Sequence, residues 1–161
     1  MIARVDPHPH QQVFFSSLDY ADMKMLLHPE EELNLQSISH DTEIFLITGI
    51  ANALPLVEHL KRYTSAIIHH EYADHHQFSK KNIVKLATAF KSSLAEKKYI
   101  ITTEKDAQRL NSHLFKELLK GLPVYYLPVR ACIQSPDEEQ FNNLIKEYVR
   151  KHPVNNRVYK A

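Results

Sequence analysis

The chain has 161 residues, of which 43% are hydrophobic and 24% charged, which is enough for a compact domain with a real core. Its 20 basic and 19 acidic residues give a formal net charge of +1, so there is no electrostatic case for a nucleic-acid partner. The sequence has two glycines, Gly49 and Gly121, and phosphate-cradling loops need several glycines close together. The composition therefore excludes a glycine-rich nucleotide loop within this chain.

Cys132 is the one cysteine, so an internal disulfide is impossible and a reducing compartment is expected. No segment reaches the roughly 18 apolar residues that span a bilayer. Residues 1–7 lack the apolar core of a signal peptide. By itself the chain is expected to be soluble and cytoplasmic.

The first part of the chain differs in composition from the rest. Residues 1–42 contain prolines, polar turn residues and an acidic run, with too little apolar content to fold alone. We predict that residues 1–42 are a connector, residues 43–152 an α/β domain, and residues 153–161 a flexible tail.

Short apolar runs alternate with helical patterns from residue 43 onward. The expected strands are residues 44–47, 65–70, 99–102 and 124–127. The expected helices are residues 54–63, 79–97, 103–121 and one starting at 135. This alternation predicts a small open parallel sheet of about four strands in the order 2-1-3-4, with helices on both faces in a Rossmann-like three-layer domain.

Three of these helices, the first, the second and the last, carry apolar residues on one face at helical spacing, which predicts a buried face. The stripe of the second helix includes Leu94. The stripe of the last helix is Phe141, Leu144, Ile145 and Tyr148.

Three turns follow the first three expected strands, at residues 49–52, 74–76 and 102–106. In open parallel sheets, ligands bind beyond the carboxyl ends of the strands, near the point where the strand order reverses. These turns should therefore converge at one edge of the sheet and form a site.

Asp74, His75 and His76 suit a general base, in which a carboxylate orients an imidazole that accepts a proton from a hydroxyl. The alternative is a surface turn in a chain with eleven histidines. A metal site would need convergent ligands, and His69 and His70 are neighbours on an expected strand, so they point to opposite faces. The sequence therefore predicts no metal ligands.

The turn after the third strand contains Thr102, Thr103, Glu104, Lys105 and Asp106. Hydroxyls at a strand end, free amides at a helix start and a lysine suit an anion. The alternative is simple helix capping, in which Thr103 caps and the two acids favour the helix dipole.

Gly49 and Asn52 complete the predicted cleft for substrate or nucleotide, on the turn after the first strand. The alternative is a tight strand-to-helix turn with no other role.

Three motifs, taken in order, resemble the C-terminal half of the tetraacyldisaccharide 4′-kinase (lipid A 4′-kinase) family. They are Thr48–Asn52, Asp74–Phe78 and Thr102–Leu110. The last of these, TTEKDAQRL, is the most specific.

The resemblance covers nearly the whole chain. Residues 126–129 match the last strand of the family, and residues 12–15 match the segment that leads in. One departure is Ala53, where many members have proline; here Pro55 comes two residues later.

The resemblance implies an enzyme that transfers the ATP γ-phosphate to the 4′-hydroxyl of a tetraacyl glucosamine disaccharide 1-phosphate, giving lipid IVA. It also implies that this enzyme acts at the inner face of the Gram-negative inner membrane, with the lipid disaccharide and the membrane surface as its partners. ATP and Mg²⁺ would be bound mainly by an N-terminal P-loop domain that this sequence lacks. This chain should then hold no cofactor and be inactive alone.

In such a kinase, His75 would reach across an interdomain cleft and pair with an aspartate of that N-terminal domain to activate the sugar hydroxyl. Two alternatives remain open. One is a non-enzymatic α/β binding or regulatory module similar to receiver domains, although threonines stand where a receiver has acids. The other is a metal-dependent phosphoesterase of the DHH class, whose Asp-His-His motif has the same sequence as Asp74–His76.

Overall fold

The computed structural model describes residues 5–152, and the predicted tail at 153–161 lies outside the described residues. The chain divides into two compact units. The larger is Tyr20–Val129, and the smaller combines the residues before Tyr20 with those after Val129. This division differs from the predicted boundary at residue 43, because residues 20–42 fold with the sheet.

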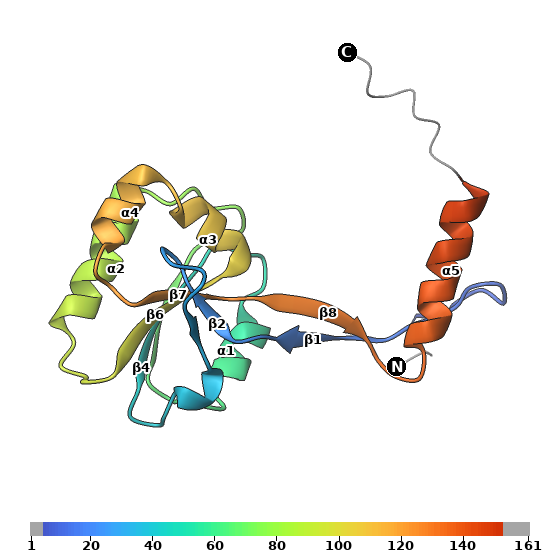
Figure 1. Ribbon diagram of the computed structural model, residues 1–161, viewed down its shortest axis with the longest axis horizontal. Coiled ribbons are helices and arrows are strands. Elements are labelled where there is room, and N and C mark those ends of the chain that lie inside the picture. The colour runs from blue at the N-terminus through green and yellow to red at the C-terminus, as the bar shows by residue number, and fades with distance from the viewer. Residues whose placement is uncertain (1–4, 153–161) are drawn as a thin grey trace, which may run out of the picture. The chain divides into compact units, whose positions relative to one another are not determined.

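A six-stranded sheet in the order β3-β2-β7-β6-β4-β5 forms the centre of the larger unit (Figure 1). Four of its strands are parallel and adjacent: β5 (Ile67–Glu71), β4 (Glu43–Thr48), β6 (Lys98–Thr103) and β7 (Val124–Leu127). They are the four expected strands, and their order confirms the predicted 2-1-3-4.

Two short strands that the sequence did not reveal extend this sheet beyond β7. Strand β2 (Met23–Met25) pairs antiparallel with β7, and β3 (Glu32–Leu33) pairs antiparallel with β2. Met23 is fully buried. The sheet therefore has six strands instead of about four, and part of the predicted connector belongs to it.

Alternate residues of β4 face two different hydrophobic clusters. Phe45 and Ile47 pack with the buried residues of α2 (Lys80–Ser92), α3 (Glu104–Leu110) and α4 (His113–Leu119). Ile44 and Leu46 pack with those of α1 (Leu54–Leu60) and the short 3₁₀ helix η2 (Leu35–Ser37). Because side chains alternate along a strand, this arrangement covers both faces of the sheet and confirms the three-layer prediction.

The second predicted helix ends earlier than expected. Helix α2 ends at Ser92. Ser93 has an extended backbone, and its side-chain Oγ accepts the amide hydrogen of Ala95. A serine that bonds its neighbouring backbone in this way competes with helix continuation. Leu94 lies past this end and is 98% exposed, so its predicted place on the buried stripe is wrong.

The third predicted helix is two helices. Helix α3 ends at Leu110, and Ser112 starts α4 by accepting the amide hydrogen of Phe115 with its side chain. Gly121 follows the end of α4 with φ +72°, as expected for a glycine one residue beyond a helix C-cap.

The larger unit begins and ends at neighbouring points. The Ala21 amide donates to the Pro128 carbonyl oxygen at 3.1 Å. The chain thus enters and leaves this unit side by side.

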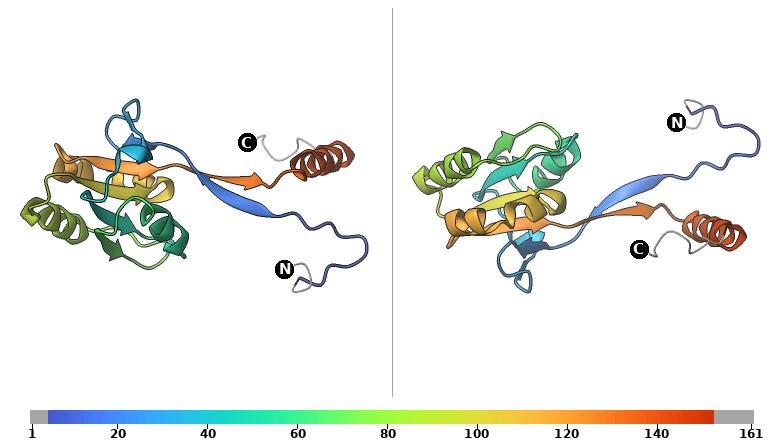
Figure 2. Two further views of the ribbon diagram at one scale, coloured as in Figure 1. Left: turned by 90° about the horizontal axis from the view of Figure 1, so that it is seen from below. Right: turned by 90° about the horizontal axis from the view of Figure 1, so that it is seen from above.

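Strands β1 (Ser16–Tyr20) and β8 (Val129–Ile133), which belong to the smaller unit except for Tyr20 and Val129, pair as a two-stranded sheet and lie side by side in Figure 2. Helix α5 follows and spans Glu138–Lys151, so it begins later than the predicted start at residue 135. None of the described helices is both long and apolar enough to cross a bilayer.

The predicted buried stripe of α5 is wrong for the described part of the chain. Only Phe141 is partly covered, by an edge-on contact with the Phe14 ring at 5.2 Å between centroids. Leu144, Ile145 and Tyr148 are exposed, and Tyr148 keeps 61% of its surface. Helical periodicity identifies an apolar face but does not supply the surface that covers it.

The helix end at Ser92 gives a matched pair of substitutions. Leu86→Ala removes a side chain that is fully buried, so we expect it to lower the free energy of unfolding by about 2–5 kcal/mol. Leu94→Ala, in the exposed segment beyond the helix, should change it by less than about 0.5 kcal/mol. Urea unfolding followed by circular dichroism measures both. Equal losses for the two variants would mean that α2 continues through Leu94.

Candidate functional site

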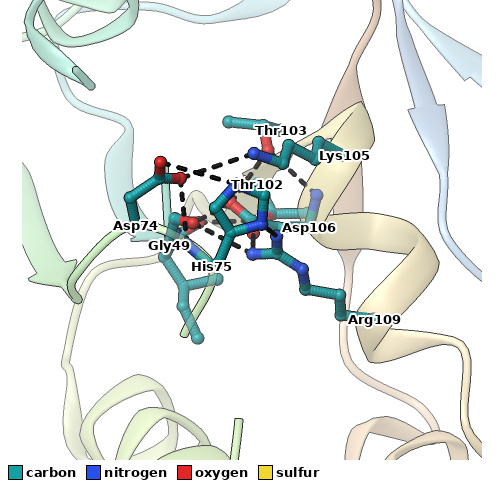
Figure 3. Close-up of polar contacts among 9 residues, drawn as sticks. Gly49, Asp74, His75, Thr102, Thr103, Lys105, Asp106 and Arg109 are labelled. Carbon is teal, nitrogen blue, oxygen red and sulfur yellow. Dashed lines mark hydrogen bonds and ion pairs between the residues drawn. The ribbon is translucent and has the colours of Figure 1, made fainter. Parts of the chain in front are cut away.

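Three loops meet at the carboxyl edge of the parallel strands, as the sequence predicted. Gly49 follows β4, Asp74 and His75 follow β5, and Thr103 joins β6 to α3. Figure 3 shows these residues with Lys105, Asp106 and Arg109 of α3 in one network of polar contacts.

Asp106 is the centre of this network and is fully buried. Its Oδ2 accepts the Gly49 amide and the Thr103 hydroxyl, both at 2.9 Å, and its Oδ1 accepts from Arg109 Nη1 at 2.8 Å. A buried carboxylate is costly unless it is paired and hydrogen-bonded. The donors from three segments meet that requirement, so Asp106 ties the loop after β4 to the start of α3.

Thr103 also caps α3, because its Oγ1 accepts the amide hydrogen of Asp106 at 3.0 Å. The capping alternative for this turn is therefore confirmed for Thr103. The same hydroxyl donates to the Asp106 carboxylate, so the cap and the network share one side chain.

Arg109 belongs to the network but was not among the predicted site residues. Its Nη1 donates to the Gly49 carbonyl at 2.9 Å as well as to Asp106, and its Nη2 lies 3.4 Å from His75 Nδ1. The sequence signal was present: an acid and an arginine three residues apart on one helix face each other.

His75 stands at the open side of the network. Its φ is +57°, a left-handed value that costs a non-glycine residue about 1–2 kcal/mol. Its amide donates hydrogen bonds to the Gly49 carbonyl oxygen at 3.1 Å and to Asp74 Oδ1 at 2.9 Å. The side chain itself is 73% exposed, so the backbone is fixed while the imidazole faces solvent.

Asp74 contacts both His75 and Lys105. Its Oδ2 lies 3.6 Å from His75 Nε2, and its Oδ1 lies 3.4 Å from Lys105 Nζ. Partial desolvation alone would raise the pKa of Asp74, but the hydrogen bond from Lys105 and the nearby His75 outweigh it and the pKa is lowered. Asp74 is therefore a carboxylate at neutral pH.

His76 has a different environment from His75. Its ring stacks on Tyr72 with 4.6 Å between centroids and meets Phe78 edge-on. Its Nε2 lies 3.1 Å from the side-chain oxygen of Asn82, which also forms a capping box with Ser79. His76 thus packs between the turn and α2 and makes none of the polar contacts of the Asp106 network.

Three further predicted residues are occupied elsewhere or stand apart. Thr102 is buried, and its hydroxyl donates to the Ile47 carbonyl at 2.9 Å, which links β6 to β4. Asn52 accepts the amide hydrogen of Leu54 at 3.0 Å, at the start of α1. Glu104 is exposed in the first turn of α3.

The histidines of the predicted turn and strand do not form a metal-ligand set. His69 Nε2 contacts the Thr48 hydroxyl at 2.8 Å, and burial lowers the pKa of both His69 and His70. Within residues 5–152, His28, Glu30 and Glu31 are the group whose ligand atoms could converge, and all three are exposed.

The structure distinguishes the two aspartates of the network by substitution. Asp106→Asn leaves Arg109 without its buried partner, so we expect a loss of about 3–5 kcal/mol in the free energy of unfolding. Asp74→Asn removes only exposed ion pairs and should cost less than about 1 kcal/mol. Urea unfolding of both variants tests this, and a small loss for Asp106→Asn would show that the network is not held by that carboxylate.

Comparison with known proteins places the chain in a family. The family model for tetraacyldisaccharide-1-P 4′-kinase matches residues 4–150. A tetraacyldisaccharide 4′-kinase of Phocaeicola vulgatus is 34% identical over 153 residues, which cover 94% of this chain and 42% of the relative. The corresponding kinase of Bacteroides thetaiotaomicron is 36% identical over 161 residues, with the same coverage.

The chain spans about two fifths of the length of these curated relatives. Among solved structures, the "apo" form of LpxK from Aquifex aeolicus in complex with ATP aligns with a TM-score of 0.47 and 16% identity, over 89% of this chain and 39% of that one. The family-model match covers more than half of the chain, from residue 4 to residue 150. The chain belongs to the tetraacyldisaccharide-1-P 4′-kinase family.

Proposed function

We propose that this chain is the C-terminal part of a kinase that phosphorylates the 4′-hydroxyl of a tetraacyl glucosamine disaccharide 1-phosphate, with ATP as donor, to give lipid IVA. The observation that carries this proposal is the family match over residues 4–150, together with relatives more than twice as long. The kinase would act at the cytoplasmic face of the inner membrane, as a peripheral protein, in lipid A biosynthesis.

His75 is the residue proposed to act on the sugar hydroxyl, supported by its exposed imidazole on a fixed backbone. In phosphoryl transfer the protein mainly positions the reactants and neutralises charge. The hydroxyl proton passes to the His75 imidazole, and the hydroxyl oxygen forms a bond to the γ-phosphorus of ATP. ADP leaves with the electrons of the broken P–O bond. Asp74 orients the imidazole from 3.6 Å.

Lys105 suits the negative charge of phosphoryl groups, since its side chain is exposed in the first turn of α3 and lies beside Asp74. The Lys105 side chain is exposed, and Asp74, 3.4 Å from its Nζ, is its ion-pair partner among residues 5–152, so it can turn toward an anion. His76 is proposed to support the turn, given its contacts with Tyr72, Phe78 and Asn82.

The carboxylates of this chain's network do not suit Mg²⁺. The oxygens of Asp106 already accept from three donors, and Asp74 faces Lys105 and His75. The chain also has no glycine-rich loop for phosphates. We therefore propose that ATP and Mg²⁺ are bound by a further N-terminal domain of the kinase, and that this chain is inactive without it.

A phosphoryl-transfer assay tests the proposal, with ATP, Mg²⁺ and the lipid disaccharide. It compares the 161-residue chain alone with a chain extended at its N-terminus to the length of the family. We expect product only from the extended protein. Product from the short chain would contradict its inactivity, and no product from either would favour the non-enzymatic α/β binding module.

His75→Ala in the extended protein should lower kcat by roughly 10²–10⁴-fold, as loss of a general acid–base group does. The matched control is His113→Ala, an exposed histidine at the start of α4 and outside the network, which should leave kcat unchanged. A loss under about tenfold for His75→Ala would move the proton-accepting role to another group.

A further inference from the structure

We infer that Arg109 is a positioning residue that fixes the tautomer of His75, with the proton on Nε2 and the lone pair on Nδ1. The tautomer follows from the geometry of this chain alone. Its consequence for phosphoryl transfer rests on the proposed function.

The Arg109 guanidinium has little freedom to move. Its Nη1 donates to Asp106 Oδ1 at 2.8 Å and to the Gly49 carbonyl at 2.9 Å. Asp106 is fully buried, and the Arg109 side chain is only 16% exposed. A planar group anchored at one nitrogen to two fixed oxygens holds its other nitrogen in place as well.

That other nitrogen, Nη2, lies 3.4 Å from Nδ1 of His75 (Figure 3). A guanidinium carries five donor hydrogens and no acceptor. A proton on Nδ1 would therefore point at another donor, whereas a lone pair there can accept. The arginine side of the ring thus favours an unprotonated Nδ1.

The opposite side of the ring favours the same tautomer. Nε2 lies 3.6 Å from Asp74 Oδ2, and an ionised carboxylate only accepts. Lys105 keeps this carboxylate in place through the other oxygen, Oδ1. Both neighbours of the imidazole therefore favour a proton on Nε2.

The backbone gives the two side chains a common reference. The Gly49 carbonyl accepts from the His75 amide at 3.1 Å and from Arg109 Nη1 at 2.9 Å. The Gly49 carbonyl oxygen therefore holds both the backbone of His75 and the guanidinium of Arg109.

For the proposed kinase, this tautomer determines which side of the ring can take a proton. A hydroxyl that gives its proton to His75 has to reach Nδ1, while a group that approaches Nε2 meets an N–H. The 3.4 Å contact is longer than an ordinary N–H···N or N–H···O hydrogen bond, so a substrate hydroxyl can replace it.

Nitrogen-15 NMR of the histidine rings in the labelled 161-residue chain tests the tautomer directly, at about pH 8.5, where histidine side chains in general are neutral. We expect a protonated Nε2 and an unprotonated Nδ1 for His75. A His75 ring with its proton on Nδ1 would overturn the inference without any variant.

Arg109→Lys tests the cause. Lysine keeps a cation beside Asp106 but has no planar second nitrogen for Nδ1. We expect a folded protein whose His75 Nδ1 chemical shift changes and in which an Nδ1–H fraction appears. The matched control is Arg62→Lys, an exposed arginine after α1, which should leave the spectrum of His75 as it is. An unchanged His75 spectrum in Arg109→Lys would also overturn the inference.

The same variant in the extended kinase separates positioning from binding. Misplacement of a catalytic group by about 1 Å can cost about 10²-fold, so kcat should fall by up to that factor while KM stays near the wild-type value. If the extended protein has no kinase activity, the proposed function fails, but the NMR result still decides the role of Arg109.

Discussion

Burying the Asp106 carboxylate costs free energy that its hydrogen-bond donors have to offset, and those donors come from parts of the chain that would otherwise be independent. The Gly49 amide belongs to the loop after β4, the Thr103 hydroxyl to the end of β6, and the Arg109 guanidinium to α3. Satisfying one charge therefore fixes three segments. These segments also position His75, because its amide donates to the Gly49 carbonyl oxygen.

The sheet and the meeting of its loops could be predicted because three of the four parallel strands, β4, β6 and β7, contain short apolar runs. Runs such as Ile44–Ile47 are buried on both faces, and this leaves a clear signal in the sequence. Once the strand order is known, the carboxyl ends must lie at one edge, which brought Gly49, Asp74, His75 and Thr103 together as expected.

Contacts between particular side chains could not be predicted in the same way. His75 and His76 are identical neighbours in sequence, and they differ in the contacts that the fold gives them: the ring of His76 packs on Tyr72, whereas His75 has a left-handed backbone. Strand β2 is three residues long and joins the sheet through a partner more than ninety residues away in the sequence, β7. The apolar stripe on α5 shows a second limit. Helical periodicity identifies the apolar face of a helix, but it does not say whether another part of the chain covers that face.

The paired ends of the larger unit have a consequence for how such a chain can be assembled. Because Ala21 and Pro128 are joined by one hydrogen bond, the whole α/β unit occupies the place of a loop between β1 and β8. Termini that lie together are the property that makes domain insertion and circular permutation tolerated. Closing a loop whose ends already meet costs little additional chain entropy. The α/β unit therefore has the geometry of a module that a host protein could gain, exchange or lose without breaking the strands on either side of it.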